Sequence, residues 1–472
     1  MCYKNIELLL KKKENKNTAP CGSLIFKIYI PNECMLKNKR KIILIYGGLL
    51  MNNKAKLFNK DFSLLVVGQI ISLFGNSILR FALPLYLLDT TNSAALFGAV
   101  SAFSLIPMIT ITPFGGIIAD RANKRNIMVF LDFLTALLIT VFALSIETFD
   151  LVITLIVTLM ALYGIQGAYQ PTVQASIPIL VDKDNLLPGN AVINQVSSLA
   201  GLLGPVIGGI LYGFYGLMPI LVASIICFFV SAIMEIFIKI PYKKQETTLR
   251  AFSIVKEDLL TSLNFIFKEN PVILKTIVII SCFNLFLSSL IMIGIPVIIT
   301  QTLNMSSQSY GVTQGMLALG GLCGGVMTGV LANKIKIYHS HIILLIAILA
   351  LTPIGVVLMF NVTPMISYIV VTVCCFLIMA VSTLFSIQIL TFIQCETPNH
   401  LTGKVISFCL AMTMCSTPIG QIIYGYLFES LNNQTHIIIF VAALFSGLIG
   451  FMSKKIFSSL KKTDIYREVC ND

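Results

Sequence analysis

The chain has 472 residues, of which 56% are hydrophobic and only 11% are charged. Soluble domains carry about 25% charged residues, so this composition excludes an ordinary soluble protein and leaves room for roughly a dozen membrane helices of about 20 residues each. The net charge of +12 does not indicate a nucleic-acid partner, because Lys and Arg gather in the termini and in alternate loops. The positive-inside rule predicts such a distribution, with the segments rich in Lys and Arg on the cytoplasmic side.

Cysteine and histidine give no sign of a metal or redox site. The 12 cysteines include no C-x-x-C pair, and the four histidines form no cluster in the sequence. Most cysteines lie in apolar stretches, where a thiol behaves as a small apolar group. We therefore expect no disulfide, metal or cofactor. The expected partners are the lipid bilayer and a small-molecule substrate, and the protein is expected to act as a monomer.

Residues 1–50 differ from the rest of the chain, because they are rich in Lys and Asn and their apolar stretches are too short to span a membrane. They also lack the layout of a signal peptide. Codons for Gly47-Gly48 can form a ribosome-binding sequence just ahead of Met51. One hypothesis is that translation starts at Met51 and that residues 1–50 are not native. The alternative is a disordered cytoplasmic tail, and the intact mass of the native protein distinguishes the two.

Apolar stretches from residue 62 onward predict twelve transmembrane helices, and hence an all-α polytopic membrane protein with both termini in the cytoplasm. In chain order the predicted spans are 62–88, 94–119, 126–145, 151–169, 191–214, 217–238, 272–299, 310–332, 341–360, 364–389, 405–428 and 436–457. The predicted parts are a first bundle at 51–238, a linker at 239–270, a second bundle at 271–458 and a cytoplasmic tail at 459–472.

The second half of the chain repeats the first. A shift of 213 residues places Gly98 on Gly311, and a shift of 212 places Gly208 on Gly420. Matching elements have the same orientation in the membrane, so the repeats are parallel and related by an axis along the membrane normal. Two pseudo-symmetric six-helix bundles are therefore expected to face one another across a central cavity.

The linker carries apolar residues at helical spacing between positions 249 and 266, with charged residues between them. This pattern predicts an amphipathic helix on the inner leaflet, which serves as a tether between the bundles.

The turn between the second and third spans reads GGIIADRANKR, residues 115–125. Asp120 follows the end of the second span, where an acid is poorly placed for the dipole of its own helix, so we expect it to serve another helix N-terminus or the neighbouring bases. Gly115 and Gly116 permit close approach of another backbone, and Asn123 tolerates a left-handed turn. The residues of this predicted gating loop are Gly116, Asp120, Arg121, Lys124 and Arg125.

The pattern G-x-x-x-D-R-x-x-K-R in this turn resembles the loop motif between the second and third helices of the major facilitator superfamily. The resemblance implies a twelve-helix transporter that works by alternating access. It also implies that the loop of Asp120 is a cytoplasmic latch, which holds the outward-open state by contact with the start of the eleventh span.

The fifth span contains Gly204-Pro205 followed by Gly208-Gly209. Proline removes a backbone donor and kinks a helix, while the glycines permit tight packing of a neighbour. The run resembles the G-P-x-x-G-G antiporter signature of exporters in this superfamily. Tight packing alone is the alternative explanation.

Ionisable residues inside a membrane are costly, so they are candidates for function. Arg80 lies near the membrane midplane, nine residues before the end of its span at Asp89. It is expected to face the cavity, to pair with an acid, or to bind an anionic group of the substrate. Asp132 is the candidate acid for pairing with Arg80 or carrying a proton, and its alternative is a structural ion pair or an interfacial carboxylate. Glu235 is a proton candidate that can instead reach the cytoplasmic interface.

Polar residues within the spans are candidates for lining the cavity, although each is also explained by a hydrogen bond between helices. They are Gln69, Asn76, Asn194, Asn284, Gln314 and Gln388.

The runs GQIISLFGNSILRFALPLYLLDTTNSAALFG and QPTVQASIPILVDKDNLLPGNAV resemble the macrolide-efflux branch of the drug:proton antiporters. The resemblance implies secondary active efflux of small amphipathic compounds, with the proton as coupling ion. An importer with the same fold is the first alternative. A membrane-embedded enzyme such as a lipid transferase is a distant one, because the spans hold no constellation of catalytic residues, and we expect no enzymatic activity.

Overall fold

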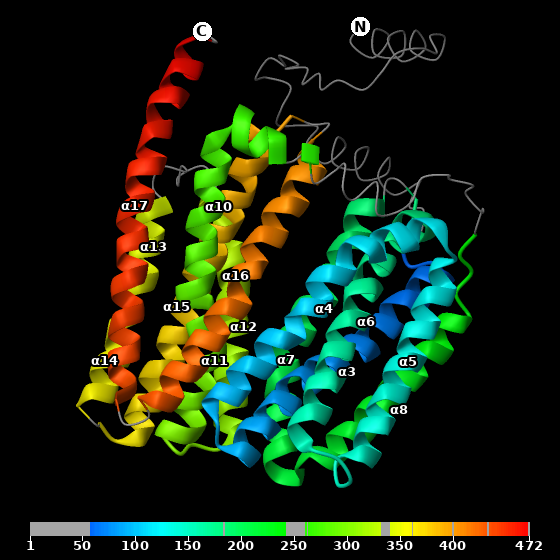
Figure 1. Ribbon diagram of the computed structural model, residues 1–472. Helices are drawn as coiled ribbons and strands as arrows, with labels where there is room; N and C mark the ends of the chain where they lie inside the picture. The colour runs from blue at the N-terminus through cyan, green and yellow to red at the C-terminus, as the bar shows by residue number, and fades with distance from the viewer. Residues whose placement is uncertain are drawn as a thin grey trace, which may run out of the picture. The chain divides into compact units, whose positions relative to one another are not determined.

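The computed structural model of the chain describes residues 57–182, 185–241, 260–261, 263–331, 340–360, 362–398, 401–431 and 434–470. In these ranges the regular structure is entirely helical, and helix occupies each of the twelve predicted spans (Figure 1). The predictions for residues 1–50, and for most of the amphipathic helix in the linker, lie outside the described residues.

The first six spans are long helices separated by short turns. They are α3 (Lys60–Thr91), α4 (Ala94–Arg121), α5 (Lys124–Ser145), α6 (Leu151–Leu180), α7 (Leu186–Tyr215) and α8 (Leu217–Ile236). Side-chain oxygens at the caps set where these helices begin, because they accept hydrogen bonds from otherwise unpaired backbone N–H groups. Asn59 caps α3, Ser93 caps α4 and Asp150 caps α6. Asn92, with a φ of 49°, turns the chain between α3 and α4 in the left-handed conformation.

The second half is helical over the other six predicted spans. Its helices are α10 (Pro271–Phe283), α11 (Ser289–Val297), α12 (Ser307–Leu331), α13 (Ser340–Leu349), α14 (Thr352–Met359), α15 (Pro364–Glu396), α16 (Thr402–Ser430) and α17 (Thr435–Cys470). The seventh span is continuous, because π-helical segments Asn284–Ser288 and Ile298–Thr302 extend α10 and α11. The ninth span is broken between α13 and α14, and Pro353 lies in the first turn of the second piece, which begins at Thr352.

Ten described helical stretches are long and apolar enough to cross a membrane when α10 is counted together with α11 and α13 together with α14, and α12 and α16 are not among them. These two helices carry Ser, Thr, Gln and Gly in place of part of the apolar surface. Both pack against the other half of the chain, so a lower hydropathy is compatible with a span that lipid covers only in part.

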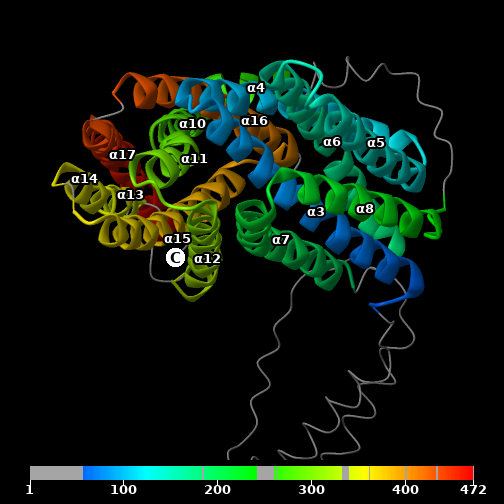
Figure 2. The same ribbon diagram turned by 90° about the horizontal axis from the view of Figure 1, so that it is seen from below.

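The helices gather into two groups. Helices α3–α8 pack on one another, and helices α10–α17 do the same. The groups meet mainly through two pairs, α4 with α16 and α7 with α12, which lie side by side in both views (Figures 1 and 2). We call the two groups the first and second bundle.

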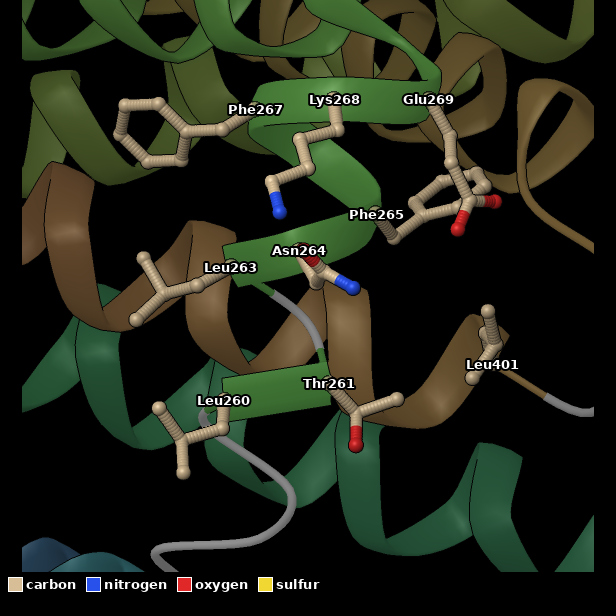
Figure 3. A pocket seen from close by; sticks show the side chains of 9 residues that line it. All are labelled: Leu260, Thr261, Leu263, Asn264, Phe265, Phe267, Lys268, Glu269 and Leu401. Carbon is tan, nitrogen blue, oxygen red and sulfur yellow. The ribbon is translucent and has the colours of Figure 1, made fainter.

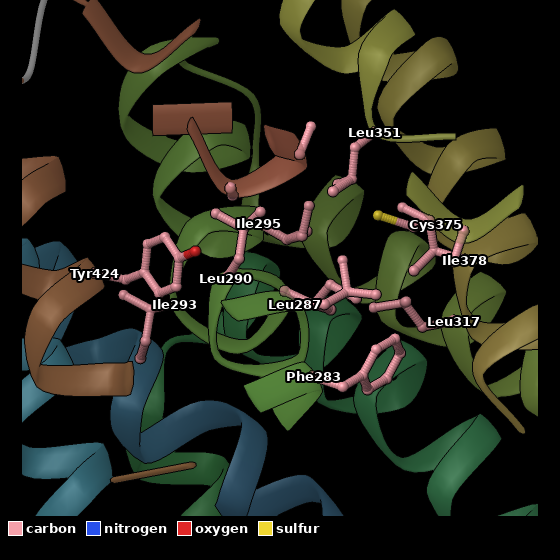
Figure 4. Packing of buried hydrophobic residues seen from close by; sticks show 14 of the residues in the cluster. Phe283, Leu287, Leu290, Ile293, Ile295, Leu317, Leu351, Cys375, Ile378 and Tyr424 are labelled. Atoms are coloured by element: carbon pink, nitrogen blue, oxygen red, sulfur yellow. The ribbon is translucent and has the colours of Figure 1, made fainter. Parts of the chain in front are cut away.

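The largest buried cluster fills the second bundle and extends to residues of α3 and α4. Its members include Phe283, Leu290 and Ile378, which pack around α11 and α15 (Figure 4). The first bundle has two clusters, one around Phe62 and Val173 and the other around the opposite half of the same helices. Tyr169, which is described below with its polar neighbours, belongs to the first of these clusters.

The turn between α4 and α5 is shorter than expected, and this corrects three predictions. Asp120 lies in the last turn of α4 and not beyond it, and only two residues separate the helices. Asn123 has a φ of −68°, so it is not left-handed; it caps α5 by accepting from the Arg125 backbone N–H. Gly115 packs against the backbone of α6, as expected, whereas a side chain at Gly116 would meet open space.

The described C-terminal part of the linker, from residue 260 onward, is helical. It ends in a π-helical segment, Phe265–Glu269, next to a surface pocket of about 570 Å³ that Leu401 also lines (Figure 3). At the C-terminal end of the chain, α17 continues to Cys470 and includes most of the predicted tail.

Candidate functional site

The two ends of the bundles differ in charge. The end that holds Lys124, Arg125 and Lys239 is here called the basic end. The opposite end, with Glu147 and Glu429 in or next to its turns, is called the acidic end.

A central cavity of about 350 Å³ lies between the bundles. Helices α3, α4, α6 and α7 line it from the first bundle, and α11, α12, α15 and α16 line it from the second. The wall is largely apolar, with Phe81 stacked on Tyr310 across the bundle boundary at a ring separation of 4.9 Å. A mainly apolar wall with a few polar groups is typical of a site for a small organic molecule.

Arg80 is the one charged side chain among the described residues that line this cavity. Its Nη1 donates to Oε1 of Gln166 at 2.5 Å, and its guanidinium carbon lies 3.9 Å from the centre of the Tyr163 ring. Of the three roles predicted for Arg80, the structure therefore agrees with a cavity-facing side chain. In the described residues it forms no ion pair with Asp132, whose partner is Ser72.

The amide side chains of Gln314 and Gln421 also line the central cavity. Gln314 donates to the Tyr310 hydroxyl at 2.7 Å. Gln421 directs its Nε2 to the sulfur of Met292, and its buried Oε1 has no hydrogen-bond partner.

Glycines close the bundles together at the acidic end. An ideal Cβ built on Gly98 of α4 would lie 2.5 Å from the carbonyl oxygen of Gln421 and 2.9 Å from Cα of Gly425. An ideal Cβ on Gly209 of α7 would lie 2.9 Å from Cα of Gly311 in α12. Only residues without a side chain allow backbones to approach this closely. Gly98 and Gly311 are the pair that the internal repeat relates.

The remaining residues of the fifth-span signature also pack tightly. A side chain at Gly204 would collide with Ser77, and the Gly311 contact includes the Pro205 carbonyl oxygen. Helix α7 continues through Pro205, and Gly208 packs against Phe81. In contrast, a Cβ at Gly201 would meet open space, and this residue lines the central cavity.

Asp132 and Glu235 come together inside the first bundle. The exposed fraction is 2% for Asp132 and 0% for Glu235, so neither carboxyl reaches an interface, which corrects that alternative for both. Tyr169 donates to Oε1 of Glu235 at 2.7 Å and accepts from Gln69 at 2.6 Å. Ser72 donates to Oδ1 of Asp132 at 3.2 Å.

The predicted cavity-lining residues divide among different places. Gln314 lines the central cavity, and Asn76 lines a small cavity beside Asp132. Gln69 is buried in the Tyr169 cluster, and Asn284 bonds to the Thr413 carbonyl of α16 as an interhelical link. Asn194 is exposed and Gln388 is half-buried.

For the gating loop, the structure describes the backbone of all five residues and the side chains of Lys124 and Arg125. Arg125 bonds to the side chain of Asn126, and both bases are half-buried at the basic end. The latch role of Asp120 remains a prediction.

Several polar residues at these sites were missed from the sequence. Gln166 and Tyr169 are three residues apart, a spacing that places two polar groups on one face of an apolar helix. Glu429 lies at the C-terminal end of its helix, where an acid does not suit its own dipole. The reasoning applied to Asp120 therefore indicates a partner helix for Glu429 as well.

Two bundles of membrane-length apolar helices around a central cavity, whose wall is largely apolar with a few polar groups, are the architecture of a multi-pass membrane transporter. The family model described as Major Facilitator Superfamily matches residues 65–420, so the chain belongs to this superfamily.

Relatives and solved structures agree with this assignment. The chain is 22% identical to macrolide efflux protein A of Streptococcus pyogenes over 365 residues, which cover 75% of this chain and 86% of that protein. It is also 22% identical to the staphyloferrin A transporter of Staphylococcus aureus over 360 residues, covering 74% and 85%. Among solved structures it is similar to nucleoside transporter NupG, with a TM-score of 0.66, 12% identity and coverage of 84% and 99%. The D-xylose-proton symporter gives a TM-score of 0.62, 14% identity and coverage of 84% and 97%.

Proposed function

We propose that this transporter is a proton-coupled exporter of small amphipathic compounds and that it works by alternating access of the two bundles. The observation that carries the proposal is the central cavity between the bundles, combined with closure at the acidic end. Helix pairs that meet glycine to glycine can separate without breaking side-chain interlocks, so rocking of the bundles would open that end.

The basic end is proposed to face the cytoplasm, with the protein in the plasma membrane and both termini inside. The support for this orientation is the gathering of Lys and Arg at that end. In this orientation the conformation described here is closed toward the outside. An exporter would load its substrate from the cytoplasm in such a state.

The cavity favours a substrate with an apolar body and several hydrogen-bonding groups. Its wall is mainly apolar, the amide side chains of Gln314 and Gln421 are part of it, and Arg80 offers a cation with no carboxylate partner among the described residues. An acidic or carbonyl-rich compound would bind Arg80 favourably. Two kinds of relative are named for macrolide efflux and for staphyloferrin A transport, so a macrolide and staphyloferrin A are the first compounds to test.

Proton coupling is proposed through the ionisable groups of the first bundle, for which Arg80, Asp132 and Glu235 are the candidates. Export against a concentration gradient needs an energy source, and proton entry through the same two-state protein supplies it without further machinery.

Everted membrane vesicles test the proposal directly, because their cytoplasmic face is outside. We expect vesicles that contain the protein to accumulate a radiolabelled macrolide or labelled staphyloferrin A when the lumen is acidified, and to release it when an ionophore collapses the proton gradient. Vesicles from the same cells without the protein are the control. Accumulation only in right-side-out vesicles would mean import and overturn the proposed direction, and accumulation unaffected by the ionophore would overturn proton coupling.

A further inference from the structure

A cluster of polar groups lies within the first bundle, apart from the central cavity. It joins Asp132 of α5, Tyr169 of α6 and Glu235 of α8, with Gln69 and Ser72 supplied by α3. Four helices therefore meet at this cluster, and two acidic side chains are removed from solvent there.

Each carboxyl has one oxygen that accepts a hydrogen bond and one that does not. Oε1 of Glu235 accepts from Tyr169, and Oδ1 of Asp132 accepts from Ser72. The other two oxygens, Oε2 and Oδ2, are buried without a hydrogen-bond partner. A buried polar atom left in this way is costly, and a bound proton, an ion or a water molecule would relieve that cost.

No described cation balances the two acids. The titratable groups that face them are Tyr169 from α6 and the two carboxyls themselves. Helix α3 contributes the uncharged Gln69 and Ser72, and Ser231 is a further uncharged neighbour from α8. An ionised carboxylate inside a membrane protein is strongly destabilising unless it is paired. Two such charges so close together repel one another as well, so a bound proton stabilises this arrangement.

The cluster is connected to the central cavity through one side chain. A small cavity of about 20 Å³, room for about one water molecule, is lined by Asp132, Tyr169 and Gln166. Gln166 also accepts the hydrogen bond from Arg80, which lines the central cavity. A substrate group that draws Arg80 away would therefore release Gln166 at the wall of the small cavity.

We propose that Asp132 and Glu235, joined around Tyr169, form a proton-binding site inside the first bundle, and that Gln166 links this site to the substrate cavity. The proton converts a carboxylate to a neutral carboxylic acid and leaves by the reverse reaction. The role of the site in transport rests on the proposed proton-coupled function, whereas its occupancy by a proton does not.

Infrared difference spectroscopy of the purified, substrate-free protein tests the occupancy. We expect carbonyl-stretch bands of protonated carboxyls at neutral pH that shift in D₂O. Asp132→Asn and Glu235→Gln should each remove intensity from these bands, while Glu147→Gln, at an exposed acid in a turn, should leave them unchanged. Bands that are identical in the wild type and both variants would overturn the site.

Two further measurements keep the test decisive. Loss of the bands on replacing choline chloride with sodium chloride would show that the site holds a sodium ion, and would overturn the proton assignment. Should an amide variant fail to give a monodisperse protein, Tyr169→Phe replaces it. Because Tyr169 bonds to Glu235, its removal should shift the carboxyl band without removing it, and an unshifted band would contradict the assignment.

The vesicle assay separates this inference from the proposed function. We expect Asp132→Asn and Glu235→Gln to lose accumulation driven by a pH gradient while retaining exchange of labelled for unlabelled compound at equal pH, and Asp132→Glu to restore part of the accumulation. A protein with the infrared bands but no transport would refute the exporter and leave the proton site standing. Full gradient-driven accumulation in both amide variants would refute the coupling role of the site.

Discussion

Glu429 of the second bundle caps the first turn of α4 in the first bundle through Ser93. Its Oε2 accepts from the Ser93 hydroxyl at 2.5 Å and from the Ala95 backbone N–H at 2.8 Å. A carboxylate is favourable at a helix N-terminus, because it satisfies free N–H groups and complements the dipole. The contact holds together the acidic ends of α4 and α16.

Glu429→Gln should weaken closure at the acidic end. The loss of charge at this exposed cap is expected to cost about 1 kcal/mol, or about a fivefold change in the ratio of closed to open protein. Spin labels attached at the positions of Glu147 and Phe360, one in each bundle, would report the open population as an increase in longer label-to-label distances. The matched control is Glu147→Gln, measured with a pair of spin labels at other positions. A distribution of label distances that Glu429→Gln leaves unchanged would contradict the cap.

Gly98→Leu should prevent the close crossing of α4 and α16. The new side chain would collide with backbone atoms of Gln421 and Gly425, which cannot rotate away. We expect transport in vesicles to fall by about tenfold or more while the protein still reaches the membrane. Gly325→Leu serves as the control, because a Cβ at Gly325 meets open space. Equal transport by both variants would argue against the glycine crossing.

Asp120→Ala should lower transport and leave substrate binding nearly unchanged, because a latch acts on the conformational equilibrium and not on the cavity. Binding of a radiolabelled macrolide to purified protein, compared with vesicle accumulation, provides the two measurements. An equal loss of binding and transport would count against a latch.

Arg80→Gln should change which compounds are transported. Removing the cation takes away the favourable contact with acidic groups, so we expect about a tenfold weaker competition by acidic amphipathic compounds and little change for neutral ones. Arg80→Lys keeps the charge but loses the planar contact with Tyr163 and is expected to lie between the two. Lys239→Gln, at an exposed cation of the basic end, is the control. The same loss for neutral and acidic compounds would show that Arg80 only supports the fold.

Tyr169→Phe should destabilise the first bundle. It deprives the buried Gln69 and Glu235 side chains of their hydrogen-bond partner at once, at a cost of about 1–3 kcal/mol. Thermal unfolding of the purified protein should show a lower midpoint. Tyr215→Phe, at an exposed tyrosine, should have almost no effect. A midpoint equal to that of the wild type would mean that these partners rearrange without loss.

Most of the fold could be predicted from the sequence because the membrane imposes local rules. The length of the apolar stretches located the spans, but it could not predict irregularities inside a span, as the ninth and seventh spans show. Pro353 lies where the ninth span breaks into two pieces, while π-helical segments keep the seventh span continuous. The α4–α5 turn was misjudged for a related reason: charged residues were assigned to the turn, although α4 extends through Asp120 and Arg121. A membrane helix can continue past the hydrocarbon core into the interfacial region, where charged side chains contact water.

The sequence by itself determined that this protein crosses a membrane many times, and that Arg80, Asp132 and Glu235 are exceptional within it, because a charge in an apolar segment is visible without coordinates. Only the tertiary structure decided their partners. Arg80 meets Gln166 and not Asp132, and the two acids meet around Tyr169, because these contacts depend on how each helix is rotated about its axis within the bundle. That rotation is set by packing between helices distant in sequence, which no local pattern specifies.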